Sequence, residues 1–132
     1  MQNRSLFVLR DEKGRVLLQH RTKDAERFPD FWSFFGGGIN PGETPEDAVR
    51  REAKEELEIE LKDLKFFKRY ELEGSGDKFV FVAPLKHSIK QLKIQQKEGN
   101  NLGLFSWEDL KNLKLPNHDL PILKDLFAHL SA

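Results

Sequence analysis

The chain has 132 residues, of which 38% are apolar and 33% charged, a size and composition typical of one globular domain. It contains no cysteine, which excludes disulfide scaffolds, thiolate metal sites and cysteine nucleophiles. Lysine and arginine number 22, as do aspartate and glutamate, and zero formal charge disfavours non-specific binding of nucleic acids or membrane surfaces. No apolar run approaches the roughly 18 residues of a membrane span, and no signal-peptide pattern is present. We expect one cytoplasmic domain over residues 1–132, with neither a nucleic-acid nor a membrane partner; the sequence assigns no oligomeric state.

The first part of the chain predicts three strands. Apolar runs at residues 5–10 and 15–21 predict two of them, joined by a turn at residues 11–14 that contains a glycine. An aromatic run at residues 31–35 predicts the third. We expect this strand to end at the glycine triplet of residues 36–38.

The best-defined helix is predicted over residues 45–57. Thr44 is a good N-cap and Pro45 suits the first helical position, while Glu46 and Asp47 suit the positive end of the helix dipole. In the second half of the chain, strands are predicted over residues 63–71 and 78–85, with a glycine turn between them, and a short strand over residues 102–105. A capping box predicts a short helix from residue 106, and apolar residues at helical spacing predict a C-terminal helix over residues 120–130. Residues 86–101 are polar and receive no assignment.

Three carboxylates of the predicted helix share one face. On a wheel of 100° per residue they lie beside the apolar stripe that should face the core, with Glu52, Glu55 and Glu56 next to Val49, Ala53 and Leu57. Like charges at this spacing repel by roughly 0.2–0.5 kcal/mol per pair, so the arrangement favours a bound cation. Hard oxygen ligands suit Mg²⁺ or Mn²⁺. The alternative is a solvated acidic face paired with nearby lysines and arginines.

The glycine triplet stands between the third strand and this helix. Glycines let the backbone approach a ligand closely, so the segment is suited to holding phosphates or donating a carbonyl to a metal. A plain tight turn is the alternative. Neither a Walker A loop nor the dinucleotide-binding fingerprint is present.

The spacing of these residues resembles a known signature. Read from Gly37, five residues precede Glu43, seven more precede Arg51-Glu52, and two more precede Glu55-Glu56. The pattern resembles the Nudix box of the Nudix hydrolase family in six of its seven fixed letters. The seventh letter is glycine in the family and Glu58 here, where a left-handed helix end would cost of order 1 kcal/mol. The helix therefore either keeps that conformation at this cost or ends differently.

The resemblance implies a Nudix-like α/β/α sandwich around a mixed β-sheet. It also implies Mg²⁺-dependent hydrolysis, with Mn²⁺ as an alternative metal, of a nucleoside diphosphate linked to another moiety, such as an oxidised or unmodified nucleoside triphosphate. The implied metal ligands are the backbone carbonyl of Gly37 and the carboxylates of Glu52, Glu55, Glu56 and Glu98. The implied catalytic set is Glu52 or Glu98 as general base, with Arg51 pairing with Glu43 and orienting Glu55. A non-catalytic nucleotide-binding module on the same fold is the alternative function.

Four residues are expected to bind the small-molecule nucleotide substrate: Arg21, Phe35, Asn117 and Asp119. Arg21 matches an arginine that many family members carry on the strand before the box. Phe35 belongs to an aromatic run, half of which should be core by strand alternation. Asn117 and Asp119 lie near the position where some purine-selective members place a base-reading side chain, and each is equally suited to be a helix N-cap.

Overall fold

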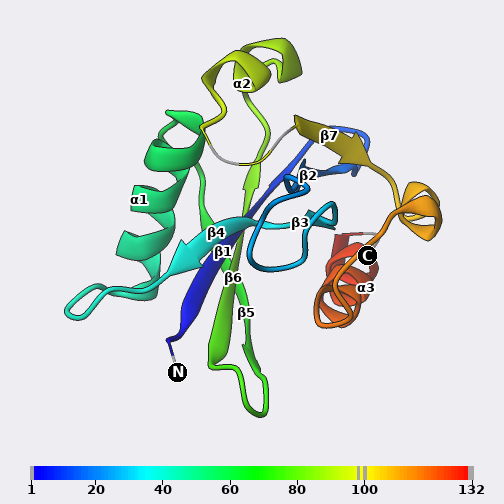
Figure 1. The fold of residues 1–132 in the computed structure, drawn as a ribbon. Coiled ribbons are helices and arrows are strands. Elements are labelled where there is room, and N and C mark those ends of the chain that lie inside the picture. Colours follow the sequence, from blue (N-terminus) through cyan, green and yellow to red (C-terminus); the bar gives the residue numbers. More distant parts are fainter. Residues whose placement is uncertain (1, 98, 100, 131–132) are drawn as a thin grey trace.

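In the computed structural model, which describes residues 2–97, 99 and 101–130, four strands precede the first helix and three follow it (Figure 1). The strands are β1 (Arg4–Arg10), β2 (Val16–His20), β3 (Trp32–Ser33), β4 (Phe35–Gly38), β5 (Lys65–Glu71), β6 (Asp77–Pro84) and β7 (Asn101–Phe105). The helices are α1 (Pro45–Leu57), α2 (Ile89–Gln95), α3 (Asp119–Leu130) and the short 3-10 helix η1 (Asp109–Asn112).

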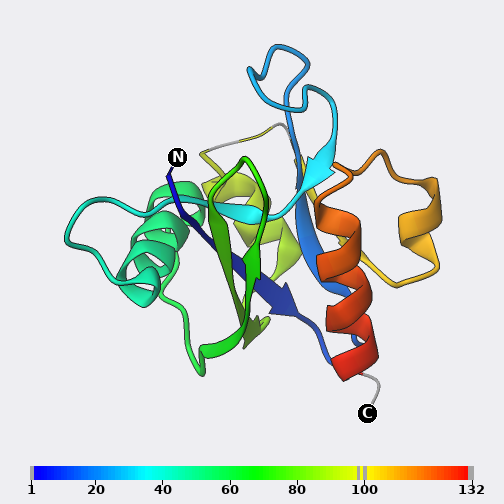
Figure 2. The ribbon, with the colours of Figure 1, turned by 90° about the horizontal axis from the view of Figure 1, so that it is seen from below.

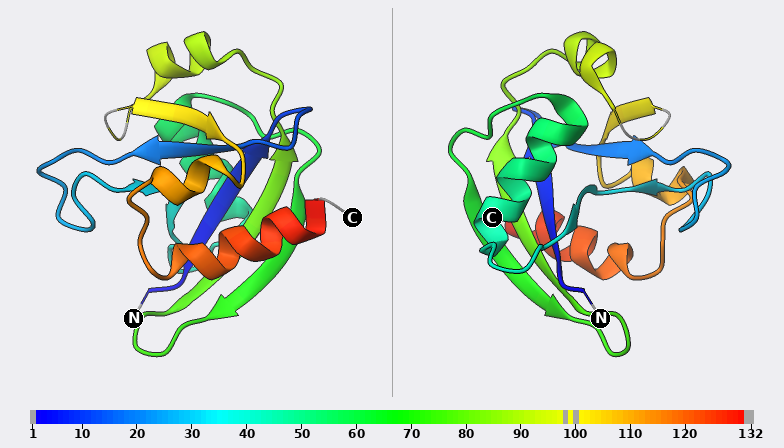
Figure 3. Two further views of the ribbon diagram at one scale, coloured as in Figure 1. Left: turned by 90° about the vertical axis from the view of Figure 1, so that its right-hand side faces the viewer. Right: turned by 60° about the vertical axis from the view of Figure 1, so that its left-hand side comes forward.

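Strand β1 is the centre of a mixed seven-stranded sheet. It runs parallel to β6 and antiparallel to β4, and it meets β2 through the pair of Arg10 with Val16. Strand β2 pairs with β3 and β7, and β5 forms the opposite edge beside β6. Figure 2 shows α1 and α3 on opposite sides of these strands, and the two views of Figure 3 show each helix in front of the sheet in turn. The predicted α/β/α arrangement around a mixed sheet is confirmed.

The sequence of β1 explains why both faces of the sheet are covered. Successive side chains of a strand point to opposite faces, so an unbroken apolar run belongs to a strand buried on both sides. Phe7 and Leu9 pack into the core beneath α1, whereas Leu6 and Val8 pack into a second core beneath α3.

Helix α1 begins at the N-cap that its sequence predicts and ends at a left-handed residue that is not glycine. The Thr44 hydroxyl accepts a hydrogen bond from the backbone N–H of Asp47 at 3.0 Å, and the Asp47 carboxylate accepts one from the backbone N–H of Thr44 at 3.4 Å. The helix ends at Leu57, and Glu58 adopts the left-handed conformation with φ 57° and ψ 40°. Of the two predicted alternatives, the left-handed helix end is therefore kept, without a glycine.

The glycine triplet departs from its predicted place. The aromatic run forms β3 and the start of β4 with a break between them, and Gly36, Gly37 and Gly38 are part of β4. They pair with Leu6, Ser5 and Arg4 of β1, respectively. A Cβ atom on Gly36 would clash with the Ser5 carbonyl oxygen, so the close approach of these strands requires glycine there.

Two further differences lie in the second half of the chain. The unassigned segment contains α2, whose N-cap Ser88 accepts a hydrogen bond from the Gln91 backbone N–H at 3.1 Å. In α3, Leu120 is exposed, whereas Leu123 and Leu126 are fully buried. The short helix predicted from residue 106 begins three residues later, as the 3-10 helix η1, and the other predicted elements agree with the observed ones within two residues. None of the helices in the described ranges is long and apolar enough to cross a membrane.

Candidate active site

The carboxylates of α1 lie against the glycines of β4. Glu56 is 2% exposed, and its carboxylate accepts a hydrogen bond from the Gly36 backbone N–H at 3.1 Å. The carboxylate of Glu52 occupies the space beside Gly37, where a Cβ atom would clash with it. Glycine at this position is therefore what allows the acidic face of α1 to approach the strand.

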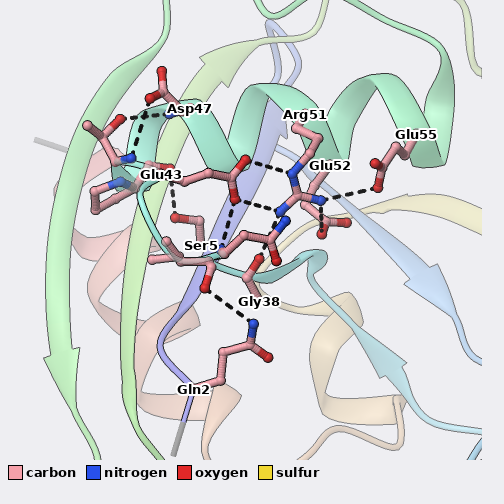
Figure 4. Close-up of polar contacts among 12 residues, drawn as sticks. Gln2, Ser5, Gly38, Glu43, Asp47, Arg51, Glu52 and Glu55 are labelled. Carbon is pink, nitrogen blue, oxygen red and sulfur yellow. Dashed lines mark hydrogen bonds and ion pairs between the residues drawn. The ribbon is translucent and has the colours of Figure 1, made fainter.

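Arg51 links these groups into one network (Figure 4). Its guanidinium donates to both carboxylate oxygens of Glu43 at 2.8 and 2.9 Å and to the Gly38 carbonyl oxygen at 2.9 Å. It also donates to Glu52 at 3.0 Å and to Glu55 at 3.3 Å. The geometry matches the predicted pairing of Arg51 with Glu43 and the predicted contact with Glu55. A planar guanidinium is suited to this task because its five N–H groups have fixed directions.

The charges of this network stabilise one another. Hydrogen bonds from Arg51, with a further one from the Asn40 backbone N–H, lower the pKa of Glu43 to about 2. The hydrogen bond with Glu43 in turn raises the pKa of Arg51 above its usual value, aided by Glu52. Both groups are therefore charged throughout the physiological pH range.

The donor set of this face fits a hard divalent cation. Three carboxylates lie within about one turn of α1, and backbone groups of β4 lie beside them. Across residues 2–97, 99 and 101–130, no three acidic or histidine side chains already converge on one point. Glu52 and Glu55 turn toward Arg51, whereas Glu56 turns toward Gly36. To bind one cation together, these three carboxylates would have to change their side-chain rotamers.

A small cavity lies on the α3 side of β4. It is partly open to solvent, has a volume of about 70 Å³ and brings together two of the predicted substrate-binding residues, Arg21 and Asp119. The Asp119 carboxylate lies 3.3 Å from the Lys78 ammonium group, and the two side chains are only 6% and 13% exposed. Burial raises the pKa of Asp119 above its usual value, and the charge of Lys78 opposes that rise.

Other predicted site residues are placed differently. Phe35 was expected to contact substrate, but it is 1% exposed and stacks on Phe7 in the core beneath α1, so its side chain is not available to a ligand. Asn117 is exposed and lines a separate apolar hollow between η1 and α3, so it does not join Asp119. Glu98 lies outside the described residues, and its predicted roles stay predictions.

Sequence reasoning missed several residues that line the cavity. Arg4 and Lys78 lie opposite each other at the starts of the parallel strands β1 and β6, and Arg27 and Phe28 come from the loop after β2. Two basic residues at the starts of two apolar strands were the available signal. It becomes informative only when the parallel pairing of those strands is known.

Comparison with known proteins agrees with this arrangement. The family model described as the NUDIX domain matches residues 2–126. The chain belongs to the Nudix hydrolase family. An uncharacterised Nudix hydrolase of Listeria innocua is 31% identical over 122 residues, which cover 89% of this chain and 72% of that protein. An RNA pyrophosphohydrolase of Pseudomonas fluorescens is 43% identical over 58 residues, which cover 44% of this chain and 33% of that protein. As a Nudix hydrolase, the protein acts on phosphoanhydride bonds.

Solved structures support the Nudix fold. A structure from a study of MutT from Aliivibrio salmonicida and Vibrio cholerae has a TM-score of 0.76 at 20% identity, covering 97% of this chain and 98% of that one. The NUDIX domain of NrtR from Shewanella oneidensis, solved with ADP ribose, has a TM-score of 0.75 at 17% identity, covering 100% and 89% of the two chains. At these identities the likeness establishes the fold alone.

Proposed function

We propose that this Nudix hydrolase cleaves a nucleoside diphosphate linked to another moiety, with assistance from Mg²⁺ or Mn²⁺. The observation that carries the proposal is the arrangement of Glu52, Glu55 and Glu56 around Arg51 and the glycines of β4. These three carboxylates, with the Gly37 carbonyl and Glu98 as further candidates, would hold the cation. A bound divalent cation would neutralise charge on the phosphate oxygens and make water more acidic.

The residues of the chain would divide the remaining tasks between them. Glu52 or Glu98 would take a proton from the attacking water, since a carboxylate is the available base on each segment. Water attacks one phosphorus of the anhydride, and the bond from that phosphorus to the bridging oxygen breaks. Arg51 and Glu43 are positioning residues, because their contacts fix the carboxylates and the Gly38 backbone relative to one another. Holding the ligands in place beforehand lowers the cost of reaching the transition state.

The nucleoside side of the substrate is assigned to the cavity across β4. Gly36 belongs to both places, because its N–H bonds to Glu56 while the same residue lines the cavity. One substrate is therefore able to reach the carboxylates with its diphosphate and the cavity with another part. Arg21 and Asp119 are the candidate contacts there. A nucleotide-like ligand also agrees with the ADP ribose in the NrtR domain.

The test is release of phosphate or pyrophosphate from a panel of nucleoside triphosphates, sugar nucleotides and dinucleotides, with and without Mg²⁺. We expect metal-dependent release from one class, and a loss of at least about a thousandfold in Glu55→Gln and Glu56→Gln. Both substitutions keep the size of the side chain and remove its charge. Circular dichroism and thermal melting verify that the variants are folded.

Glu46→Gln is the matched control, because Glu46 is an exposed glutamate in the first turn of the same helix. It should retain full activity. Full activity in both Glu55→Gln and Glu56→Gln would contradict the proposal. Calorimetric binding of a nucleotide without turnover of any panel member would favour the non-catalytic binding module. Comparing Glu52→Gln with Glu98→Gln in a pH–rate profile assigns the base, since removal of the base abolishes the acidic limb.

A further inference from the structure

Ser5 is a fully buried polar residue in the otherwise apolar interior of β1. Its side chain is 0% exposed, and the four residues that follow it are all buried and apolar. Its hydroxyl donates a hydrogen bond of 2.8 Å to the carbonyl oxygen of Pro45, the first residue of α1 (Figure 4). We propose that Ser5 is a positioning residue for the metal site, because this bond fixes the helix that carries the acidic face to the central strand of the sheet. The inference rests on the proposed function and deepens it.

Ser5 lies beside the glycines that the carboxylates of α1 approach. It pairs with Gly37 of β4 on one side and with β6 on the other. Its carbonyl oxygen is the atom that a Cβ on Gly36 would meet, so Ser5 touches β4 through its backbone and α1 through its hydroxyl. Strand pairing on both sides holds this backbone in place. The short side chain therefore presents its hydroxyl to the helix at a well-defined position.

The hydrogen bond determines where α1 lies, and the helix does not need it in order to form. In an α-helix the carbonyl of Pro45 already accepts the N–H four residues later, and a carbonyl oxygen has a second lone pair for another donor. The capping box starts the helix without any group from β1. Apolar packing of Val49, Ala53 and Leu57 is non-directional, whereas a hydrogen bond has a preferred distance and angle. The Ser5 hydroxyl therefore adds a fixed point to that packing.

Among the described residues, the other polar contacts between α1 and β4 involve the candidate metal ligands or a group that holds them. The Glu56 carboxylate accepts a hydrogen bond from the Gly36 N–H at 3.1 Å, and Glu56 would have to change rotamer to share a cation. Arg51 reaches the Gly38 carbonyl oxygen at 2.9 Å, but its guanidinium also binds two of the ligands. The bond from Ser5 contains no candidate ligand. It can therefore hold α1 in place while the carboxylates rearrange.

The test compares Ser5→Ala with Tyr70→Phe. Ser5→Ala removes the hydroxyl and adds no bulk to the strand. Tyr70→Phe removes a hydroxyl that joins β5 to the helix on the other face, since Tyr70 donates to Asp125 of α3 at 2.7 Å. Each variant loses one hydrogen bond between a strand and a helix, so both should unfold at somewhat lower urea concentrations. We expect only Ser5→Ala to alter the acidic face of α1.

Hydrogen exchange in the metal-free protein reports directly on the contact between α1 and β4. NMR follows the Gly36 amide, whose N–H donates to Glu56 of α1. We expect this amide to exchange at least about tenfold faster in Ser5→Ala than the loss of global stability explains. In Tyr70→Phe its exchange should follow global stability alone. A selective increase means that α1 has loosened from β4, which a general loss of stability would not produce.

Mn²⁺ calorimetry and kinetics measure the consequence for the metal site. We expect Ser5→Ala to bind Mn²⁺ about tenfold more weakly than wild type, the lower end of the range for residues that orient metal ligands. At saturating Mn²⁺, kcat should fall about tenfold and the nucleotide KM should change by less than about twofold, because the cavity assigned to the nucleoside lies across β4.

The outcomes separate this inference from the proposed function. A Mn²⁺ affinity in Ser5→Ala equal to that of Tyr70→Phe would overturn the inference, as would Gly36 exchange that follows global stability in both variants. A wild-type protein that neither binds Mn²⁺ nor hydrolyses any panel member would refute the proposed function. A selective increase of Gly36 exchange in Ser5→Ala would even then retain Ser5 as the residue that fixes α1 on the sheet.

Discussion

The two sides of β4 are built in different ways. On the α1 side, one arginine makes five hydrogen bonds to groups drawn from residues 38–55, and these groups remain partly exposed. On the α3 side, the cavity collects residues from β1, β2, the following loop, β6 and α3, and its charged centre is one buried pair. The residues proposed to take part in the reaction are thus close together in the sequence and share several contacts. The residues proposed to determine specificity are far apart in the sequence and depend on a single ion pair.

The difference predicts unequal responses to loss of one partner. Arg51 and Glu43 retain 27% and 20% exposure, so solvent shares the cost of a broken contact. Lys78 and Asp119 are almost fully buried, so when one of them is removed, solvent hardly compensates the charge of the other. Substitutions on each side of β4 should therefore differ in their effects on stability and activity.

The largest effect is expected for Lys78→Met, which leaves the buried Asp119 carboxylate without its 3.3 Å partner. Removing one member of a buried pair typically costs about 3–5 kcal/mol, and urea unfolding measures it. Lys68→Met is the matched control, since Lys68 lies 3.4 Å from Asp125 with both side chains about half exposed. The control should cost less than about 1 kcal/mol.

Two additional measurements test the cause of that loss. The double variant Lys78→Met with Asp119→Leu should recover most of the stability, because it removes both charges. The loss in Lys78→Met should shrink as pH falls, since Asp119 has a raised pKa and an acid with a raised folded pKa favours the folded state below that pKa. Equal destabilisation by Lys78→Met and Lys68→Met would show that the cavity pair is no different from a surface pair.

The next effect is expected for Arg51→Lys. A lysine cannot reproduce the fork that spans both Glu43 oxygens and the Gly38 carbonyl. Partners that orient metal ligands are typically worth 10- to 100-fold in metal affinity or activity, so we expect losses of about that size in both. Mn²⁺ calorimetry measures the affinity, and kcat and KM are determined separately. Arg50→Lys is the matched control, because Arg50 directly precedes Arg51 and pairs with Glu46. It should change the Mn²⁺ affinity and the activity by less than about twofold. A similar loss in both variants would contradict the special role of Arg51.

The α1 side was predictable because its determinants follow one another in the chain. Thr44 and Pro45 fixed the start of the helix, and the resemblance to the Nudix box predicted the pairing of Arg51 with Glu43. The acidic face followed from helical geometry alone, since Val49 and Ala53 of the neighbouring stripe are fully buried. Local sequence determines local structure wherever capping and periodicity agree.

The α3 side was not predictable because its neighbours are set by strand pairing. Arg4 and Lys78 meet only because β1 and β6 run parallel in a particular register, and nothing within either strand specifies that register. The same limit explains the glycine triplet, since Gly36 looks like a loop residue until β1 is placed against it. Phe35 was read as a ligand contact although its side of the strand faces the core.

A smaller effect is expected for Glu43→Gln, and it depends on pH. The pKa of Glu43 is lowered from 4.5 to about 2, mainly by Arg51, so its charged form stabilises the folded state above pH 4.5. That contribution is lost as pH falls through about 2, where the folded carboxylate takes up its proton. The stability difference between wild type and variant should therefore be constant above pH 5 and vanish toward pH 2. The midpoints of urea unfolding across this pH range measure the stability difference. Glu12→Gln, in the exposed turn before β2, is the control for removal of one charge. A difference that persists at pH 2 would mean that the substitution acts through packing and not through charge.

The smallest effect is expected at Glu58, where α1 ends in a left-handed residue without glycine. Glu58→Gly relieves a strain of about 1 kcal/mol but loses an exposed contact with Lys97 at 3.0 Å, which is worth little. The backbone cap is unaffected, because the Glu58 N–H donates to the Lys54 carbonyl at 3.0 Å whatever the side chain. We therefore expect the melting temperature to rise by a few degrees with kcat/KM unchanged. Asp63→Gly is the matched control, since Asp63 also has a positive φ, of 53°, and lies far from the acidic face in the segment before β5. A gain from Asp63→Gly with none from Glu58→Gly would mean that the Lys97 contact already offsets the strain at the end of α1.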